Sequence, residues 1–272
     1  MSDVSLDILK KLDYNEFGDR GRLAIVGGGY LSYNPPIIAA SSASRIGIDS
    51  IYLLVPEKLT RLRCIDSLTI SVIPLPDFKI TQGVVQRIEK LIDRRRIRAD
   101  IFHLGPGFTG QRGYIVELVN SLDGRGIGMV LDSGSLYPEV LNSDVNWDNI
   151  VITPHEGEFR MLFNEELGID LSRYIVVLKR LRGVSIYLRG SEVSSVSHEC
   201  WPTRYGMGYV VSGVLSGLYA YTRDINLSIL LTQELLLKTC EKISENGCFH
   251  VTVDDFIEVL GLIIRGLFST SH

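Results

Sequence analysis

The feature that most constrains the fold of this sequence is a regular alternation of short apolar runs with helical patterns. The apolar runs occupy residues 23–26, 50–55, 68–73, 101–104, 128–131, 150–152 and 175–178. Helical patterns at residues 37–45, 82–94 and 112–121 separate several of these runs. Apolar strands joined through helices are typical of βαβ units, whose right-handed crossovers produce a mainly parallel sheet. The sequence therefore predicts an α/β fold.

The rest of the chain predicts a hairpin followed by a helical C-terminal part. Strand-like runs at residues 184–188 and 193–196 flank Arg189, Gly190 and Ser191, a typical hairpin connection. Helical patterns follow at residues 208–221, 225–243 and 253–268, and another precedes the first strand at residues 4–12. Because no repeat, low-complexity tract or linker interrupts this order, we expect residues 1–272 to form a single domain.

Charge and hydropathy exclude two classes of partner. The chain has 28 Lys and Arg residues against 32 Asp and Glu residues, which gives a net charge of −4. No basic excess is present to neutralise a nucleic-acid backbone, so we expect no nucleic-acid partner. Apolar stretches such as residues 210–218 are much shorter than the ~20 residues that cross a bilayer. The charged N-terminus is unlike a signal peptide, and we expect a cytoplasmic protein without membrane contact.

The four cysteines are Cys64, Cys200, Cys240 and Cys248, and none of them pairs at metal-ligand spacing. We therefore expect no metal site made by these side chains. In a reducing cytoplasm we expect all four to remain inert thiols, because disulfides are rare there.

Two glycine-rich turns follow predicted strands, at the sheet edge where α/β proteins bind ligands. Gly27, Gly28 and Gly29 end the first strand, in a pattern that fits neither the dinucleotide-binding fingerprint nor the P-loop. A turn that merely closes a strand–helix corner explains these glycines without a ligand. Gly105 and Gly107 flank a proline, and they let the backbone approach a ligand closely, although turn formation also explains them.

A polar cluster follows the strand at residues 150–152. It contains Thr153, His155, Glu156 and Glu158 and is more polar than a turn requires. The two glutamates also fit a helix N-terminus through its dipole, and Thr153 fits a helix N-cap. For His155, a ligand-facing role and a structural role are equally compatible with the sequence.

The fourth motif is the glycine-rich start of the helix predicted at residues 208–221. Gly206 and Gly208 precede or open this helix, and its N-terminus is a natural site for an anion. Gly213 and Gly217 lie four residues apart and are well explained by close helix packing. Packing explains Gly206 and Gly208 less well.

These four motifs, in this order, resemble those of the ATP/ADP-dependent NAD(P)H-hydrate dehydratases of the ribokinase-like superfamily. The resemblance covers nearly the whole chain and includes Asp132 after a strand and Lys179 within another. The block that begins at Thr153 is its most specific part. The resemblance implies a three-layer α/β/α sandwich with a mainly parallel central sheet. It also implies repair of hydrated NADH and NADPH, and self-association into a homo-oligomer.

The family pattern assigns residues of this chain to two ligands. The resemblance implies that the hydrated nicotinamide nucleotide binds near Gly28, Gly29, Asn34, Pro35, Gly105, Gly107 and His155. It implies that ATP or ADP, with Mg²⁺, binds near Asp132, Thr153, Glu158, Lys179 and Gly208. Gly206, Met207 and Gly208 would form an anion hole for the transferring phosphoryl group. The implied reaction is phosphoryl transfer to the hydrate hydroxyl, followed by elimination of phosphate.

The chain departs from the family on the ligand side. Tyr209 stands where the family's Gly-Thr-Gly-Asp motif has its base, and a phenol with a pKa of about 10 is protonated at pH 7. The family's Asp-Ala-Asp has lost its second carboxylate to Gly134, and its Lys-Gly has become Lys179 and Arg180. Three hypotheses remain: an active or weakened dehydratase, a non-catalytic nucleotide-binding relative, and a kinase for a small hydroxylated molecule.

Overall fold

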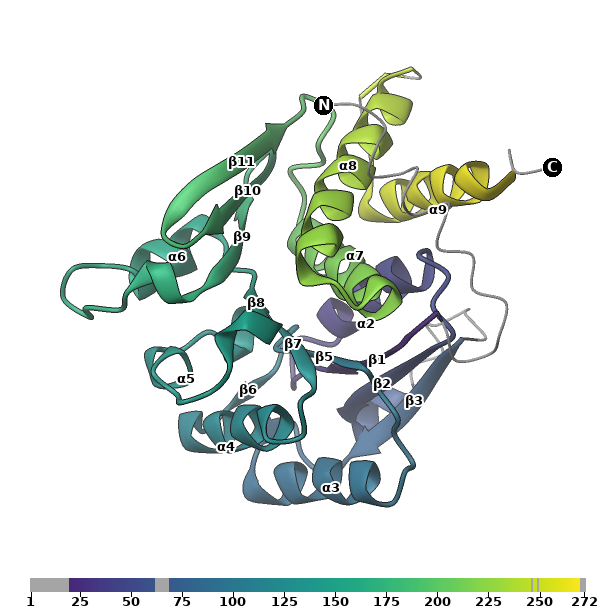
Figure 1. The fold of residues 1–272 in the computed structure, drawn as a ribbon. Coiled ribbons are helices and arrows are strands. Elements are labelled where there is room, and N and C mark those ends of the chain that lie inside the picture. Colours follow the sequence, from purple (N-terminus) through teal and green to yellow (C-terminus); the bar gives the residue numbers. More distant parts are fainter. Residues whose placement is uncertain (1–19, 62–68, 246, 249, 270–272) are drawn as a thin grey trace.

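The computed structural model describes residues 20–61, 69–245, 247–248 and 250–269. They form one sheet of nine strands, in the order β11-β10-β9-β8-β7-β5-β1-β2-β3, and a separate two-stranded sheet, β4-β6 (Figure 1). The strands of the large sheet are β1 (Arg22–Val26), β2 (Ser50–Pro56), β3 (Ile70–Leu75), β5 (Ile101–Leu104), β7 (Gly128–Leu131), β8 (Ile150–Ile152), β9 (Ile175–Arg180), β10 (Gly183–Leu188) and β11 (Ser191–Ser197).

The large sheet is parallel from β3 to β9 and becomes antiparallel only at β10 and β11. The prediction of a mainly parallel sheet is thus confirmed. The hairpin predicted around Gly190 is also confirmed, because β10 and β11 pair antiparallel on either side of it. In a parallel sheet the carboxyl ends of neighbouring strands meet at one edge, so the strand-end motifs are brought together there.

Helices cover both faces of the sheet, which makes the three layers predicted (Figure 1). One face carries α2 (Asn34–Ser44), α7 (Met207–Thr222), α8 (Ile225–Ser244) and α9 (Val253–Ser269). The other face carries α3 (Gln82–Asp93), α4 (Arg112–Asp123), α5 (Pro138–Leu141) and α6 (Glu156–Leu162). Short 3₁₀ turns lie at Glu57–Arg61, Ser133–Ser135, Trp147–Asn149 and Leu171–Arg173.

The apolar runs are continuous because their strands are buried on both faces. In β1, Leu23 and Ile25 belong to the core shared with α2 and α7, whereas Ala24 and Val26 belong to the core shared with α3 and α4. All four side chains are fully buried. Such burial removes the polar alternation of a half-exposed strand, which is why these segments are recognisable in the sequence.

Glycines in α7 allow this helix to lie directly against α2. A Cβ atom at Gly213 would lie 2.4 Å from the carbonyl oxygen of Ala39, and one at Gly217 would lie 3.1 Å from the Cα of Ala43. The packing interpretation of these two glycines is therefore confirmed. The contact fixes the position of α7, and with it the position of the helix N-terminus at the sheet edge.

Some expectations need correction. The third strand runs from Ile70 to Leu75, somewhat later than residues 68–73. The sheet of β4 (Lys79–Ile80) and β6 (Thr109–Gly110) was not expected, since two-residue strands carry no periodicity. The helix expected at residues 4–12 lies outside the described residues. Of the helices described, none is long and apolar enough to span a bilayer.

The prediction that all cysteines are free thiols is wrong for two of them. Cys200 and Cys248 form a disulfide, with their Cα atoms 4.9 Å apart. Their pairing across 48 residues depends on tertiary packing and leaves no signal in the spacing. Cys240 is a buried free thiol, and Cys64 lies outside the described residues.

Candidate active site

The two glycine turns at the ends of β1 and β5 pack against each other. The Gly28 amide donates a hydrogen bond of 2.8 Å to the carbonyl oxygen of Pro106. A Cβ at Gly29 would lie 3.0 Å from the Gly107 carbonyl oxygen, and one at Gly107 would lie 2.9 Å from the Pro35 ring. The structure thus brings together Gly28, Gly29, Pro35, Gly105 and Gly107, the group expected near the hydrated nucleotide. Asn34, also in this group, is exposed at the first residue of α2.

Gly105 is the position where this packing requires glycine most strictly. Its φ is +119°, and a Cβ there would lie 1.6 Å from the carbonyl oxygen of Asp132. Its carbonyl oxygen accepts a hydrogen bond of 3.1 Å from the Gly134 amide. These contacts join the β5 turn to the turn after β7, which carries Asp132.

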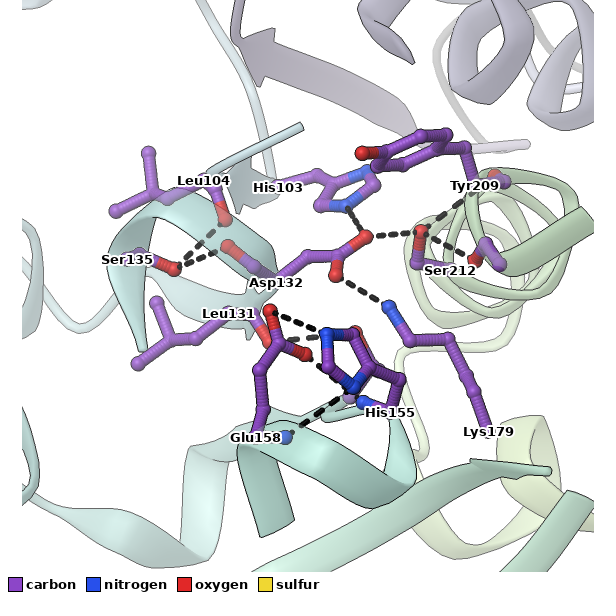
Figure 2. Close-up of polar contacts among 12 residues, drawn as sticks. His103, Leu104, Leu131, Asp132, Ser135, His155, Glu158, Lys179, Tyr209 and Ser212 are labelled. Carbon is purple, nitrogen blue, oxygen red and sulfur yellow. Dashed lines mark hydrogen bonds and ion pairs between the residues drawn. The ribbon is translucent and has the colours of Figure 1, made fainter. Parts of the chain in front are cut away.

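Asp132 is the centre of a buried polar network at the carboxyl end of β7 (Figure 2). The Lys179 Nζ lies 2.5 Å from Oδ1 of Asp132, and the Ser212 Oγ donates a 2.7 Å hydrogen bond to Oδ2. The Nε2 of His103 lies 3.7 Å from the same Oδ2. The side chain of Lys179 is 9% exposed, and those of Asp132 and His103 are fully buried.

The network keeps Asp132 ionised. Burial alone would raise the pKa of this carboxyl, but the Lys179 ammonium and His103 outweigh burial and lower it well below its usual range. Burial also lowers the pKa of His103, so its imidazole is neutral at pH 7. Lys179 and Ser212 each bind one oxygen of the carboxylate, so Asp132 positions Lys179, and its lowered pKa makes it a weak proton acceptor at pH 7.

A cavity of about 580 Å³ opens beside this network. Its wall on the β8 and β9 side includes Ser133, His155, Glu158, Lys179 and Arg180. The opposite wall is the segment before α7 together with the first turn of α7. Thr153 and Asp132 are fully buried rather than part of this wall.

His155 combines the two roles that the sequence left open. Its Nδ1 accepts hydrogen bonds from the amides of Gly157 (3.0 Å) and Glu158 (3.2 Å), and Glu158 accepts from the His155 amide at 2.8 Å. This capping box starts α6, so the interpretation of Thr153 as the cap is wrong. Thr153 instead donates to the Leu131 carbonyl oxygen at 3.3 Å. The ring of His155 still faces the cavity, with its side chain 61% exposed.

The N-terminus of α7 and Lys179 place positive charge at the same point of the cavity. Gly206 precedes the helix with a φ of +110°. A Cβ at Gly208 would lie 3.4 Å from Cδ and 3.7 Å from Nζ of Lys179, so the ammonium lies against the first turn. Amides of a first turn lack intrahelical acceptors, and together with an ammonium they suit a phosphate group.

Tyr209 lines the cavity beside this point. Burial, and next the charge of Asp132, raise the pKa of Tyr209 to about 12. The phenol is therefore protonated at neutral pH and is no proton acceptor there. Its ring makes an edge contact with Tyr205, with centroids 6.1 Å apart.

Several cavity residues were not predicted from the sequence. Trp201, Arg204 and Tyr205 lie in the irregular segment between β11 and α7. The fourth sequence motif begins at residue 203, but no role was assigned to Arg204 or Tyr205 within it. Arg180 also lines the cavity, with ion pairs to Glu156 at 3.3 Å and to Glu192 at 3.0 Å. Only the folded chain brings these side chains to the same cavity.

The residues fit a magnesium ion only together with a phosphate ligand. Among the described residues, one group of three side chains has the spacing of metal ligands: Glu199, Cys200 and Cys248. The two cysteine sulfurs are joined in a disulfide, and the group is not part of the cavity lining. The cavity offers the carboxylates of Glu156 and Glu158, and Asp132 is occupied by Lys179. Mg²⁺ commonly keeps several waters and binds through substrate phosphates, so this sparse set is sufficient.

A three-layer α/β sandwich whose cavity at the carboxyl edge of the sheet is lined by Lys179 and the first turn of a helix is typical of phosphate-binding proteins. Comparison with known proteins identifies the family. The family model described as NAD(P)H-hydrate dehydratase matches residues 23–260, and the chain belongs to that family. The resemblance noted in the sequence is thereby confirmed.

Two curated relatives illustrate the similarity. The ADP-dependent (S)-NAD(P)H-hydrate dehydratase of Cenarchaeum symbiosum (strain A) is 29% identical, covering 91% of this chain and 90% of its own length. The enzyme of the same name from Nitrosopumilus maritimus (strain SCM1) is 32% identical over 76% of this chain and 75% of its own.

Solved structures confirm the ribokinase-like fold. The ADP/ATP-dependent NAD(P)H-hydrate dehydratase of Bacillus subtilis, co-crystallised with ATP and Mg²⁺, superposes with a TM-score of 0.73. The superposition covers 96% of this chain and 97% of that one at 13% identity, so it supports the fold alone.

Proposed function

We propose that this protein dehydrates hydrated NADH or NADPH, with ADP or ATP as the phosphoryl donor. The observation that carries the proposal is the position of Lys179, whose ammonium is held by Asp132 against the first turn of α7. Family membership supports the reaction type, and the names of the two curated relatives, both ADP-dependent, favour ADP as the donor.

In the proposed reaction, the amides at Gly206 and Gly208 and the Lys179 ammonium hold the donor's terminal phosphate and stabilise its charge. Asp132 fixes Lys179 and thereby the position of that phosphate. Mg²⁺, when bound, would neutralise part of the phosphate charge. The hydrate's hydroxyl oxygen forms the new O–P bond as the donor's bridging O–P bond breaks; the shortened nucleotide leaves with the bridging oxygen, and the hydroxyl proton passes to a phosphate oxygen and then to water. Loss of the phosphate and of a proton from the adjacent carbon then restores the dihydronicotinamide double bond.

Residue 209 does not take the proton of the substrate hydroxyl in this proposal. The Tyr209 phenol has a pKa of about 12 and is already protonated. Phosphoryl transfer through a loose transition state forms little bond to the attacking oxygen, so it depends mainly on positioning and charge. We therefore propose an active enzyme that is slower than one with a carboxylate at this position.

The substrate side is proposed to be the pair of glycine turns and His155. Gly28, Gly29 and Gly105 are buried where the two turns pack together, whereas Gly107 is partly exposed and Asn34, at the start of α2, is exposed. A ligand would therefore approach this region at Gly107 and Asn34. The ring of His155 lines the cavity together with Lys179, whereas the two glycine turns are not part of the lining described for that cavity.

The test is an assay of purified protein with hydrated NADH or NADPH, Mg²⁺, and either ADP or ATP, following recovery of dihydronicotinamide absorbance. We expect recovery that requires nucleotide and is faster with ADP. No recovery with either donor, at enzyme concentrations near those of the substrate, contradicts the proposal.

A matched pair of glycine variants connects the activity to the site. Gly208→Ala places a methyl group beside Lys179, where the phosphate is proposed to bind, and should lower kcat/KM by about 100-fold. Gly113→Ala adds a methyl group in α4 with no atom within 4 Å and should leave the rate unchanged. Equal rates in the two variants would place the reaction elsewhere.

The protonated phenol of Tyr209 also favours a second candidate, a nucleotide-binding relative without catalysis. Such a protein would show a nucleotide-induced rise in Tm and no dehydration, even with prolonged incubation. A phosphorylated small alcohol accumulating in the same assay would instead indicate the kinase hypothesis.

Three broader features remain part of the proposal. We propose one domain over residues 1–272, because nine strands, from β1 near the start of the described chain to β11, form one continuous β-sheet. We also propose a homo-oligomer and a cytoplasmic location, both from the family resemblance and the composition. Size-exclusion chromatography with light scattering tests the oligomer.

A further inference from the structure

The Cys200–Cys248 disulfide joins the start of the segment that lines the proposed nucleotide cavity to the segment between α8 and α9, which lies outside that lining. Cys200 lies between β11 and α7, and Cys248 lies between α8 and α9. Cys200 is buried, and Cys248 is partly exposed, so a reductant can reach the bond from the Cys248 side. The proposed reaction gives neither cysteine a role.

The segment that follows Cys200 forms one wall of the cavity. Trp201, Pro202, Thr203, Arg204 and Tyr205 all line it before the chain enters α7 at Met207. The backbone hydrogen bonds described for this segment are local, from Trp201 to His198 (3.1 Å) and from Met207 to Arg204 (3.3 Å). Local bonds of this kind do not fix a segment to the rest of the molecule.

Several contacts that attach the wall segment to the body of the protein lead to the α8–α9 side, besides the contact of Tyr205 with Tyr209 of α7. One is the disulfide itself. The second is Trp201, which is buried and contacts Phe256 of α9 with ring centroids 6.2 Å apart. A third lies at the end of the segment, where a Cβ at Gly206 would be 3.1 Å from Ile38 of α2 and 3.2 Å from Val253, the first residue of α9. The disulfide therefore holds the beginning of the segment whose other end, at Gly206, carries the anion-binding turn of α7.

We propose that Cys200–Cys248 is a redox-sensitive tether that holds the cavity wall and the anion-binding turn of α7 in their binding geometry. Reduction by a dithiol breaks the Sγ–Sγ bond, adds two electrons and two protons to give two thiols, and converts the reductant to its disulfide. The reduced wall segment is free to move away from α9, which weakens nucleotide binding. This regulatory role rests on the proposed nucleotide site.

The experiment compares oxidised and dithiothreitol-reduced protein with three readouts. Peptide mapping after alkylation should find Cys200 and Cys248 blocked before reduction and alkylated after it. Limited trypsinolysis should cleave after Arg204 at least about tenfold faster in the reduced form, with cleavage after Arg160, an exposed site on α6, as the internal control. Calorimetry should show ADP binding about tenfold weaker in the reduced form.

Variants separate the tether from general effects of the reductant. The double variant Cys200→Ser/Cys248→Ser should match the reduced protein in both states. Cys240→Ala, which removes the buried free thiol, should respond to reduction as the wild type does. If cleavage after Arg160 accelerates as much as cleavage after Arg204, the effect is general unfolding and the tether proposal is wrong.

Other outcomes also decide the question. Free thiols at Cys200 and Cys248 before reduction overturn the proposal. So does alkylation that requires a chelator and releases zinc, because Glu199 and the two sulfurs would then form a metal site. Unchanged cleavage and ADP affinity after reduction overturn it as well. Faster cleavage after Arg204 with no ADP binding in either state keeps the tether and contradicts the proposed function instead.

Discussion

The ammonium of Lys179 lies 2.5 Å from Oδ1 of Asp132, in a place where the lysine side chain is 9% exposed and the aspartate is fully buried. An ion pair with so little solvent is strongly coupled, because removing one partner leaves an uncompensated buried charge. The pair also fixes the position of the Lys179 side chain, because Asp132 holds it against the first turn of α7.

The first prediction concerns this pair. Lys179→Met should lower the free energy of unfolding by about 3–5 kcal/mol, because the carboxylate of Asp132 then remains buried without its cation. The double variant Asp132→Asn/Lys179→Met should recover part of that loss. Guanidinium unfolding of the wild type, both single variants and the double variant measures the coupling. Strictly additive losses would contradict the assignment of a coupled pair.

The second prediction concerns pH. Burial lowers the pKa of His103 below the usual value for histidine of about 6.5. Below that pH the unfolded chain therefore binds a proton that the folded protein does not bind. Stability should therefore fall as the pH drops from 7 towards 5, with a contribution from His103 of up to about 1.4 kcal/mol per pH unit. His103→Gln should flatten this dependence, and His250→Asn, at an exposed position, is the control. Equal slopes for wild type and His103→Gln would disprove the effect.

The third prediction concerns Tyr209. A phenol with a pKa of about 12 accepts no proton at pH 7, so Tyr209→Phe should change kcat by less than about threefold. Tyr209→Asp introduces a carboxylate beside the start of α7 and should raise kcat by about 100-fold if it reaches the substrate hydroxyl. Steady-state kinetics with ADP measures both. A large loss in Tyr209→Phe would show that the phenol has a direct catalytic role.

The fourth prediction reverses the usual effect of a helical glycine. Gly→Ala in a helix normally stabilises by about 1 kcal/mol. Gly266→Ala in α9, where a Cβ meets no atom within 4 Å, should follow that rule. Gly213→Ala should destabilise by about 1–3 kcal/mol, because its Cβ would lie 2.4 Å from the Ala39 carbonyl oxygen and push α7 from α2. Thermal unfolding should give shifts in Tm of opposite sign.

The fifth prediction concerns the stability that the disulfide provides. Closing a loop of 48 residues should stabilise the folded state by about 4 kcal/mol in the chain-entropy model. Reductant should therefore lower the guanidinium midpoint of the wild type and leave Cys200→Ser/Cys248→Ser unaffected. A reductant-insensitive wild type would argue against the bond.

Much of the fold follows from local sequence pattern. The strands at β5, β7 and β8 were predicted to the residue, because each is a short apolar run with breakers on both sides. The glycine motifs were also located correctly at strand ends and at the start of α7. The family was also identified from the sequence, because the four motifs and their order along the chain resemble those of the family.

The electrostatics of the site were decided by tertiary structure. Asp132 meets Lys179 across 47 residues and Ser212 across 80, and the sequence does not reveal that these contacts take both carboxylate oxygens. The same limit applies to Thr153, expected in the site and found buried, and to Arg204, found in the cavity wall and not expected.

The sequence by itself determined the layers of this protein, the positions of its strand-end turns and its family. The strands and their turns depend on hydrophobic periodicity and on backbone freedom at single residues, which are local properties, whereas the three layers and the family came from the resemblance of the motifs. Only the tertiary structure decided that Asp132 supports Lys179, that Tyr209 keeps its proton, and that Cys200 and Cys248 are joined. Burial and proximity set those properties, and both arise when segments far apart in the chain pack together.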